Sequence, residues 1–393
     1  MLLRSPDSTE AGDAPTRRER RAAAARVWLG RWVFSPLTGM TFGRWWRTLC
    51  DNRFRVHPLY ALRAGLTTLQ ALANTFDARR EERRFGAQLA RILVRRPIFV
   101  LGHYRSGTTH LHNLLAVDPR NTAPDNLVAT FSRTFLLTEQ RKRAWGAKLT
   151  MSRRPQDDVL LDLVVPGEDE LALCSSTGLS THMAWHFPAR ERRYERYLTL
   201  REAGAEEREV WKSALLEFAR KLTLRSGGRT LVLKSPCHTA KVRWILEVFP
   251  DARFVHIDRD PFTIFRSTMK MERTVPPLFT YQRRDPRTIE ACVLRRFREM
   301  YAAYLEDRQR VPAGQLCEVS FTQLEEDPLG TLERVYAQLG IEGFADARAE
   351  LEGYLRSIRS YRKNRYSELD PELAARIARE WRQYFDAFGY AAG

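Results

Sequence analysis

Residues 97–109 read PIFVLGHYRSGTT and carry the strongest structural signal in the chain. Four apolar residues follow the proline, which is the pattern of a short buried strand in a parallel sheet. Gly102 ends that strand, Gly107 follows at G-x4-G spacing, and a helical pattern runs on to Val117. A glycine-rich turn between a strand and a helix directs backbone N–H groups and a helix N-terminus at a phosphate. The stretch therefore predicts a phosphate-binding loop in an α/β fold.

The order of strand and then helix repeats further along the chain. Strands are predicted at residues 230–234, 253–258 and 315–321, each followed by a helix, at 238–249, 261–272 and 328–339. Strands that alternate with helices favour a parallel sheet covered on both faces. The sequence thus predicts an α/β, P-loop-type three-layer sandwich with a central parallel sheet, helical insertions near 206–226 and 287–310, and a C-terminal helix over 371–388.

The first quarter of the chain has a different character. Residues 1–20 have no apolar period and are expected to form a disordered tail, and residues 21–95 a helical extension before a main domain at 96–393. Its helices are expected at 22–32, 58–76 and 81–94. The aromatic, apolar stripes of this extension leave two interpretations open, peripheral contact with a membrane or cover for the main domain. Cover is favoured, because apolar helix faces are more often buried within a protein.

Composition and charge exclude several classes of protein. The 393 residues are 44% hydrophobic, as in globular proteins, and 65 basic against 48 acidic residues give a net charge of +17. Only eight of the basic residues are lysine, and the arginines are interspersed with glutamates instead of forming one tract. This interspersion, with no recognised nucleic-acid module, argues against a nucleic-acid partner.

The cysteines and the apolar segments bear on location. Five cysteines stand far apart without a CxxC pair, which fits neither a disulfide framework nor a zinc ribbon and indicates a reducing compartment. The first residues lack the apolar run of a signal peptide, and no uncharged apolar stretch approaches the roughly 18 residues of a membrane span. We therefore expect a cytoplasmic protein.

The phosphate loop lacks the parts that ATP hydrolysis needs. Thr108 stands where an ATP-binding P-loop has lysine, and the nearest cation is Arg105, inside the loop. The strand at 253–258 ends in Asp258, but Arg259 follows at once and no Mg²⁺-holding carboxylate is evident. A P-loop kinase or NTPase remains the alternative function, and these two features disfavour it.

Two motifs together resemble the PAPS-dependent sulfotransferases, most closely bacterial members with a Pro-x-Glu-Asp-Glu segment, here residues 166–170. The 5′-phosphosulfate loop of that family reads (Lys/Arg)-Ser-Gly-Thr-Thr, and the second motif is an arginine with a serine eight residues later. The resemblance implies that PAPS is the co-substrate. It implies donor-binding roles for Arg105, Ser106, Gly107, Thr108, Thr109, Arg259 and Ser267. The family's late Arg-Lys-Gly segment corresponds to Arg362 and Lys363, although Asn364 replaces its glycine.

A cation and a base are needed for sulfuryl transfer. Lys234 ends the strand at 230–234 and matches the family's catalytic lysine, although a lysine at a strand end is often only a surface cation. Candidates for the base that accepts the acceptor's proton are Glu168 or Glu170 first and His238 second. Charge at a helix N-terminus is the competing explanation for the two glutamates.

The acceptor is the least determined part of the reaction. We expect a hydroxyl of a small molecule, a lipid or a glycan, bound by residues within 125–225 and 275–310. His182 and His186 are spaced to share a helix face, but only two ligands are visible, so a place in the acceptor pocket or the core is favoured over a metal site. We expect no metal. The sequence leaves open whether the chain forms a homo-oligomer.

Overall fold

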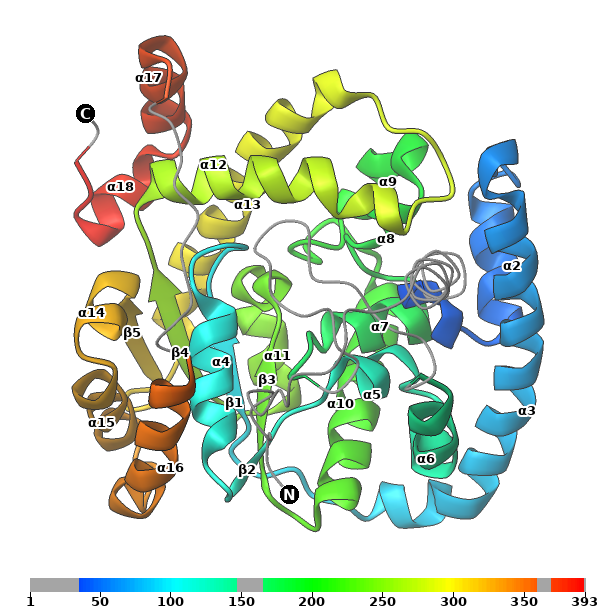
Figure 1. The fold of residues 1–393 in the computed structure, drawn as a ribbon, viewed down its shortest axis with the longest axis horizontal. Helices are drawn as coiled ribbons and strands as arrows, with labels where there is room; N and C mark the ends of the chain where they lie inside the picture. The colour runs from blue at the N-terminus through cyan, green and yellow to red at the C-terminus, as the bar shows by residue number, and fades with distance from the viewer. Residues whose placement is uncertain (1–34, 147–164, 359–368, 392–393) are drawn as a thin grey trace, which may run out of the picture.

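A five-stranded parallel sheet lies at the centre of the molecule. In this computed structural model, which describes residues 35–146, 165–358 and 369–391, the strand order is β2-β3-β1-β4-β5 (Figure 1). The strands are β1 (Ile98–Leu101), β2 (Asn121–Thr122), β3 (Thr230–Lys234), β4 (Arg253–Asp258) and β5 (Leu316–Ser320). The four strands predicted from sequence are confirmed, and the two-residue β2 is an addition that the sequence did not reveal.

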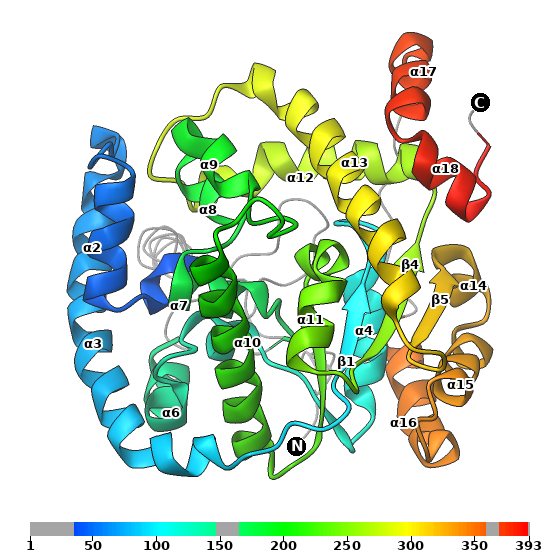
Figure 2. The same cartoon turned by 180° about the vertical axis from the view of Figure 1, so that it is seen from behind.

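The two faces of the sheet bury different side chains, because alternate strand residues point to opposite faces. Ile98 and Val100 pack in one core with apolar residues of α4 (Thr108–Val117), α15 (Pro328–Gln338) and α16 (Phe344–Ser357). Phe99 and Leu101 pack in a second core with residues of α10 (Ala205–Ser226), α11 (Val242–Val248) and α13 (Ile289–Asp307). Figures 1 and 2 show α4 on one side of the sheet and α13 on the other. The predicted three-layer α/β sandwich is therefore confirmed.

Helical insertions surround this core. Before β3 lie α5 (Asn126–Thr130), α6 (Phe135–Gly146), α7 (Glu170–Thr177), α8 (Met183–His186), α9 (Glu191–Glu195) and α10. After β4 come α12 (Pro261–Thr274) and α13, and β5 leads through α14 (Phe321–Glu326) into α15. The helices expected near 206–226 and 287–310 are thus α10 and α13.

Several predicted helix boundaries were wrong. The helices expected at 58–76 and 81–94 are one continuous helix, α3 (Ala61–Ala90), since no glycine or proline interrupts residues 66–85. The helix expected at 238–249 is a 3-10 turn, η4 (Pro236–Ala240), followed by the short α11. The expected C-terminal helix breaks at Trp381 into α17 (Pro371–Glu380) and α18 (Arg382–Phe388). The tail at 1–20 and the helix at 22–32 lie outside the described residues.

The N-terminal helices α2 (Phe42–Asp51) and α3 cover part of the insertions. Trp45 of α2 is fully buried, with its ring 5.2 Å from that of Tyr281 and 6.5 Å from that of Phe187. Its indole N–H donates a 2.8 Å hydrogen bond to Thr68 of α3. One face of each helix therefore belongs to the interior. Within the described ranges, no helix has the length and apolarity to cross a membrane.

Candidate active site

The loop between β1 and α4 has a backbone shaped for an anion. Gly102 and Gly107 have φ angles of 142° and 106°, and Arg105 also lies in the left-handed region at 72°. A Cβ at Gly107 would collide with the ring of Phe321, so this position requires glycine for space as well as for conformation. Helix α4 begins immediately afterwards at Thr108, so its free N–H groups open on the loop.

Hydrogen bonds hold the loop in this form. The Ser106 hydroxyl is fully buried and donates to the carbonyl oxygen of His103 at 2.9 Å. The amide of Gly102 donates to Thr239 of η4 at 2.7 Å, and the Thr239 hydroxyl donates back to Gly102 O at 3.1 Å. Thr108 is buried and Thr109 half-buried at the start of α4. The loop is thus tied to the residues that follow β3.

The two sequence motifs meet at the carboxyl edge of the sheet, because β1 and β4 are neighbouring strands. The guanidinium of Arg105 donates from Nε to the hydroxyl of Ser267 at 2.8 Å. Arg259 donates from Nη1 to the carbonyl oxygen of Arg105 at 3.1 Å, and its guanidinium lies 3.9 Å from the ring centre of Phe321. Tyr384 of α18 accepts from the Arg259 amide and donates to its carbonyl, which fixes that backbone. Two cations and a hydroxyl therefore converge beside the loop.

Lys234 enters the same edge from the other neighbour of β1. It ends β3 opposite Val100, and its side chain is almost fully buried. Its Nζ donates to Glu168 Oε1 at 2.9 Å, and 27% of the Glu168 side chain remains exposed. This ion pair joins the strand end to the segment that precedes α7.

The next two acidic residues point elsewhere. Asp169 accepts from His238 Nε2, and Glu170 pairs with Lys241 at 3.3 Å, with all four side chains fully buried. Burial acts to raise the pKa of Asp169, but the charge and hydrogen bond of His238 outweigh it and hold that pKa below its ordinary value. Three consecutive acids thus bind three bases of residues 234–241, and these buried pairs fix the position of Glu168.

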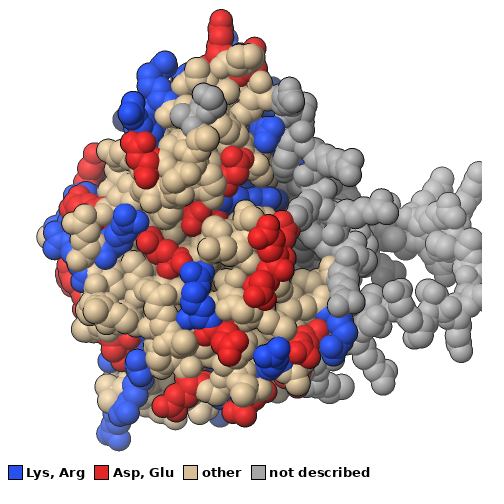
Figure 3. Space-filling model, turned by 90° about the vertical axis from the view of Figure 1, so that its left-hand side faces the viewer, with Lys and Arg blue, Asp and Glu red and all other residues tan. Residues whose placement is uncertain are grey.

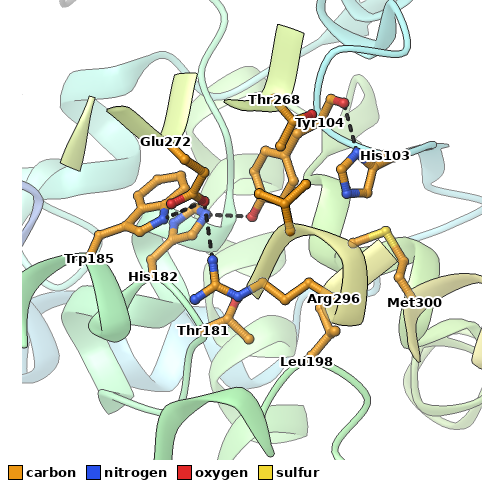
Figure 4. Close-up of a pocket in the computed structure, with 11 residues that line it drawn as sticks. His103, Tyr104, Thr181, His182, Trp185, Leu198, Thr268, Glu272, Arg296 and Met300 are labelled. Atoms are coloured by element: carbon orange, nitrogen blue, oxygen red, sulfur yellow. Dashed lines mark hydrogen bonds and ion pairs between the residues drawn. The ribbon is translucent and has the colours of Figure 1, made fainter. Parts of the chain in front are cut away.

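A pocket is lined by His103 and Tyr104 of the β1–α4 loop and by residues in and beside helices α8, α12 and α13 (Figure 4). The Tyr104 hydroxyl lies 2.9 Å from His182 Nε2 and 3.1 Å from the sulfur of Cys237. His182 Nε2 lies 3.9 Å from Glu168 Oε2. Burial lowers the pKa of His182 and raises that of Tyr104, so both side chains are neutral at pH 7. The apolar lining comes from Leu198, Val293, Met300 and the ring of Trp185, which stacks on His182 at 4.4 Å.

One wall of this pocket is charged. Glu272 accepts from the indole of Trp185 at 3.0 Å and from Arg296 at 3.1 Å, and it is also paired with Arg284. Burial acts to raise the pKa of Glu272, but Arg296 and Arg284 outweigh it, so the carboxylate stays ionised. These ion pairs hold the side chains of this wall in place.

Comparison with known proteins shows the family to which the chain belongs. The sequence profile described as "Sulfotransferase family" matches residues 97–346, from β1 into α16. The chain belongs to this sulfotransferase family. It is 32% identical over 364 residues to the omega-hydroxy-beta-dihydromenaquinone-9 sulfotransferases Stf3 of Mycobacterium bovis and Mycobacterium tuberculosis, covering 91% of this chain and 92% of each relative.

Solved structures agree on the fold of this sulfotransferase. STF1 of Mycobacterium tuberculosis superposes with a TM-score of 0.63 at 17% identity, over 94% of this chain and 99% of STF1. STF9 of Mycobacterium avium gives 0.66 at 18% identity, over 98% of this chain and 99% of STF9. At these identities the likeness concerns the architecture alone.

The sulfotransferase's histidine pair does not form a shared metal face. His186 hydrogen bonds through Nδ1 to the carbonyl of Phe279 at 2.9 Å, whereas His182 faces Tyr104. Among the described residues, Glu191, Glu195 and Cys292 have metal-ligand spacing, but both carboxylates are paired with arginines.

Sequence reasoning missed several polar residues of the site. Tyr104 lies inside the β1–α4 loop but belongs to no motif, and its partner His182 is 78 positions away in the chain. Glu272 and Arg296 carried no motif and meet only through the packing of α12 on α13. Arg362 and Lys363, expected near the donor's 3′-phosphate, lie outside the described residues.

Proposed function

We propose that this sulfotransferase moves a sulfuryl group from PAPS to a hydroxyl of an apolar acceptor, bound beside Tyr104 and His182. The observation that carries the proposal is the convergence of Arg105, Ser267 and Lys234 around one phosphate loop. Backbone N–H groups at a helix N-terminus and charged forks are the groups that bind phosphates best.

The two ends of the donor are assigned to different residues. The 5′-phosphosulfate is expected on the loop, against Ser106, Gly107, Thr108 and Thr109, with Arg105 beside it. The 3′-phosphate is expected at Arg259 and Ser267, with the contribution of Arg362 and Lys363 still a prediction. Arg259 is well suited because Tyr384 holds its backbone and Phe321 its guanidinium, so little freedom is lost on binding.

Lys234 and Glu168 are proposed to act in the transfer itself. The acceptor oxygen attacks sulfur, and the bond from sulfur to the bridging oxygen of the 5′-phosphate breaks with its electron pair remaining on the phosphate. Lys234 neutralises the charge that grows on that oxygen, as fixed cations do in phosphoryl transfer. As its ammonium turns to the donor, the hydrogen bond from Lys234 to Glu168 Oε1 breaks, and this oxygen accepts the proton of the acceptor hydroxyl.

Burial favours Glu168 over the other two candidate bases. Glu170 and His238 are each 0% exposed and hold their own partners, Lys241 and Asp169. Glu168 keeps 27% of its side chain exposed and borders the pocket through His182. A base must reach the proton that it removes, so the partly exposed carboxylate is the fitting one.

The acceptor is proposed to be a long apolar alcohol. The Stf3 relatives are named for an omega-hydroxylated dihydromenaquinone, a lipid with a terminal hydroxyl. Leu198, Val293 and Met300 in this chain give the pocket an apolar side next to the polar Tyr104 and His182. Such a division suits an alcohol at the end of a hydrocarbon chain.

The kinase alternative has little support. Besides Thr108 in place of lysine, the strand-end carboxylate of Asp258 accepts a 2.6 Å hydrogen bond from Tyr390. Burial raises the pKa of Asp258 to about 6, which is the opposite of what a Mg²⁺ ligand needs.

The test measures donor binding and transfer on the full chain. Thermal shift should show stabilisation by 3′-phosphoadenosine 5′-phosphate and none by ATP with Mg²⁺. Mass spectrometry should then find a sulfated long-chain alcohol when PAPS is supplied. Glu168→Gln should lower kcat by on the order of 10²–10⁴, with Glu170→Gln as the matched control that lowers stability instead. Stabilisation by ATP and Mg²⁺ alone would refute the sulfotransfer proposal.

A further inference from the structure

The outer face of α3 carries apolar side chains and no charge over four turns. Leu62, Leu69, Leu72 and Phe76 are 56, 65, 40 and 64% exposed. The other exposed positions between Ala61 and Phe76 are alanine or glycine, and the single charged residue of that span, Arg63, is buried. From Leu62 to Phe76 the row extends about 21 Å along the helix. Most exposed helix faces in globular proteins are polar, so this row indicates a partner.

Helix α2 widens this row into a surface. The Phe42 amide donates to Thr75 at 2.8 Å and Trp45 donates to Thr68, which holds α2 alongside α3. Trp46 is 50% exposed and touches Phe42 and Phe54, with ring centres 6.0 and 5.2 Å away. We call these exposed residues the α2–α3 surface: Trp46, Phe54, Leu59, Leu62, Leu69, Leu72 and Phe76. Figures 1 and 2 place α2 and α3 at the outer edge of the molecule, away from α14–α16.

Basic residues flank the α2–α3 surface. Residues 41–84 contain nine basic and four acidic side chains. Three of the four acids are already paired, Asp51 with Arg193, Asp77 with Arg141 and Glu81 with Lys221. The exposed arginines stand at the two ends of the surface, at positions 47, 53 and 55 and at 79, 80, 83 and 84. The opposite side of the molecule, by contrast, shows acidic and basic side chains interspersed (Figure 3).

We propose that the α2–α3 surface docks on an anionic lipid bilayer, with its aromatic and leucine side chains in the interface and the arginines on lipid phosphates. Apolar side chains with tryptophan, bordered by arginines, form the pattern of helices that lie in a membrane interface. A second copy of the chain fits less well, because an isologous contact would bring the flanking arginines together with few free carboxylates to meet them.

Docking would bring the acceptor pocket near the lipid. The inner face of α2 packs through Trp45 on Phe187, which directly follows α8, and α8 supplies Trp185 to the pocket. The inference itself stands apart from the proposed function, since binding to vesicles can be measured without donor or acceptor.

The experiment is vesicle flotation of the full chain with phosphatidylglycerol–phosphatidylcholine and with pure phosphatidylcholine vesicles. We expect binding to the anionic vesicles that weakens at high salt, because salt screens the arginines. Leu69→Ser with Phe76→Ser should weaken binding by about tenfold or more. The double variant Arg79→Gln with Arg83→Gln should weaken binding to anionic vesicles about fivefold per residue, and should not change binding to pure phosphatidylcholine vesicles.

The matched control is Leu93→Ser with Val210→Ser. These side chains are 70 and 39% exposed but lie outside the α2–α3 surface, so vesicle binding should persist. All variants change exposed residues, and their melting temperatures should equal that of the wild type. The inference would be overturned if the Leu69→Ser/Phe76→Ser and Leu93→Ser/Val210→Ser variants bound vesicles equally. It would also be overturned if the wild type did not float with anionic vesicles. The inference would also be overturned if light scattering showed a dimer, the Leu69→Ser/Phe76→Ser variant were monomeric, and vesicle flotation of that variant equalled that of the wild type.

Discussion

Replacing Lys234 by alanine should slow the chemical step and leave the donor bound. The lysine is 2% exposed and its Nζ lies 2.9 Å from Glu168, at the strand end next to the phosphate loop. If it meets charge that appears only in the transition state, its loss should lower kcat by on the order of 10²–10³, about 2.7–4 kcal/mol of barrier. Affinity for 3′-phosphoadenosine 5′-phosphate should remain nearly unchanged.

The structure supplies a matched control in Lys241. It is also a buried lysine paired with a carboxylate of the same acidic segment, but its partner Glu170 is 0% exposed. Lys241→Ala leaves that carboxylate buried without its charge partner, so it should lower the free energy of unfolding by about 3–5 kcal/mol. Lys234→Ala should cost less stability, since Glu168 can still reach water.

The assay is steady-state transfer at saturating PAPS, with nucleotide affinity by calorimetry and stability by urea unfolding. The two variants should differ in their effects: Lys234→Ala should mainly lower kcat, and Lys241→Ala should mainly lower the free energy of unfolding. A Lys234→Ala enzyme that keeps the wild-type kcat at saturating donor would show that this lysine only supports the fold, and the proposed transfer step would be wrong.

Three further predictions concern donor recognition, metal and pH. Arg259→Ala should weaken the binding of 3′-phosphoadenosine 5′-phosphate by about 2–4 kcal/mol, measured by calorimetry, and should hardly change the binding of its 3′-hydroxyl analogue. Equal losses of affinity for both nucleotides would show that Arg259 does not bind the 3′-phosphate. Turnover should be unchanged by EDTA, since fixed cations of the protein stabilise the charge; activity restored only by Mg²⁺ would contradict this. Burial raises the pKa of Asp258 to about 6, so the folded state holds this proton more tightly than the unfolded state. Its stabilising contribution should therefore be present below about pH 4 and be lost as the pH rises through about 6. In the Asp258→Asn variant, the free energy of unfolding measured in urea should change less with pH across that window. An unchanged pH profile would refute the raised pKa of Asp258.

Much of the proposed donor site could be outlined from the sequence because its signals are local. The strand, the two glycines and the helix of residues 97–117 are adjacent in sequence, and steric rules for glycine and helix ends apply there without knowledge of distant residues. The spacing of Arg259 and Ser267 is equally local, since eight residues span the strand end and two turns of α12. That Arg105 meets Ser267 followed only from the adjacency of β1 and β4.

The extent of α3 and the position of the pocket beside Tyr104 could not be predicted in the same way. Residues 58–94 have two apolar periods, but the packing of Glu81 against Lys221 and the uninterrupted backbone continue the helix through the charged stretch. Likewise, Tyr104, Glu272 and Arg296 come from segments far apart in the chain, and only the packing of the insertions brings them to one pocket.

The acidic residues before α7 show where the sequence stops and tertiary structure decides. The sequence by itself determined only that three acids follow one another at 168–170, and it left charge at a helix N-terminus as the competing explanation for them. It could not determine which of the three stays accessible, since charge and helix position are nearly the same for all of them. Tertiary structure decides by pairing Asp169 with His238 and Glu170 with Lys241 in the interior. Burying an ion is costly unless a partner meets it, so Asp169 and Glu170 lie inside with their own bases, and Glu168 stays partly exposed, paired with Lys234 and 3.9 Å from His182.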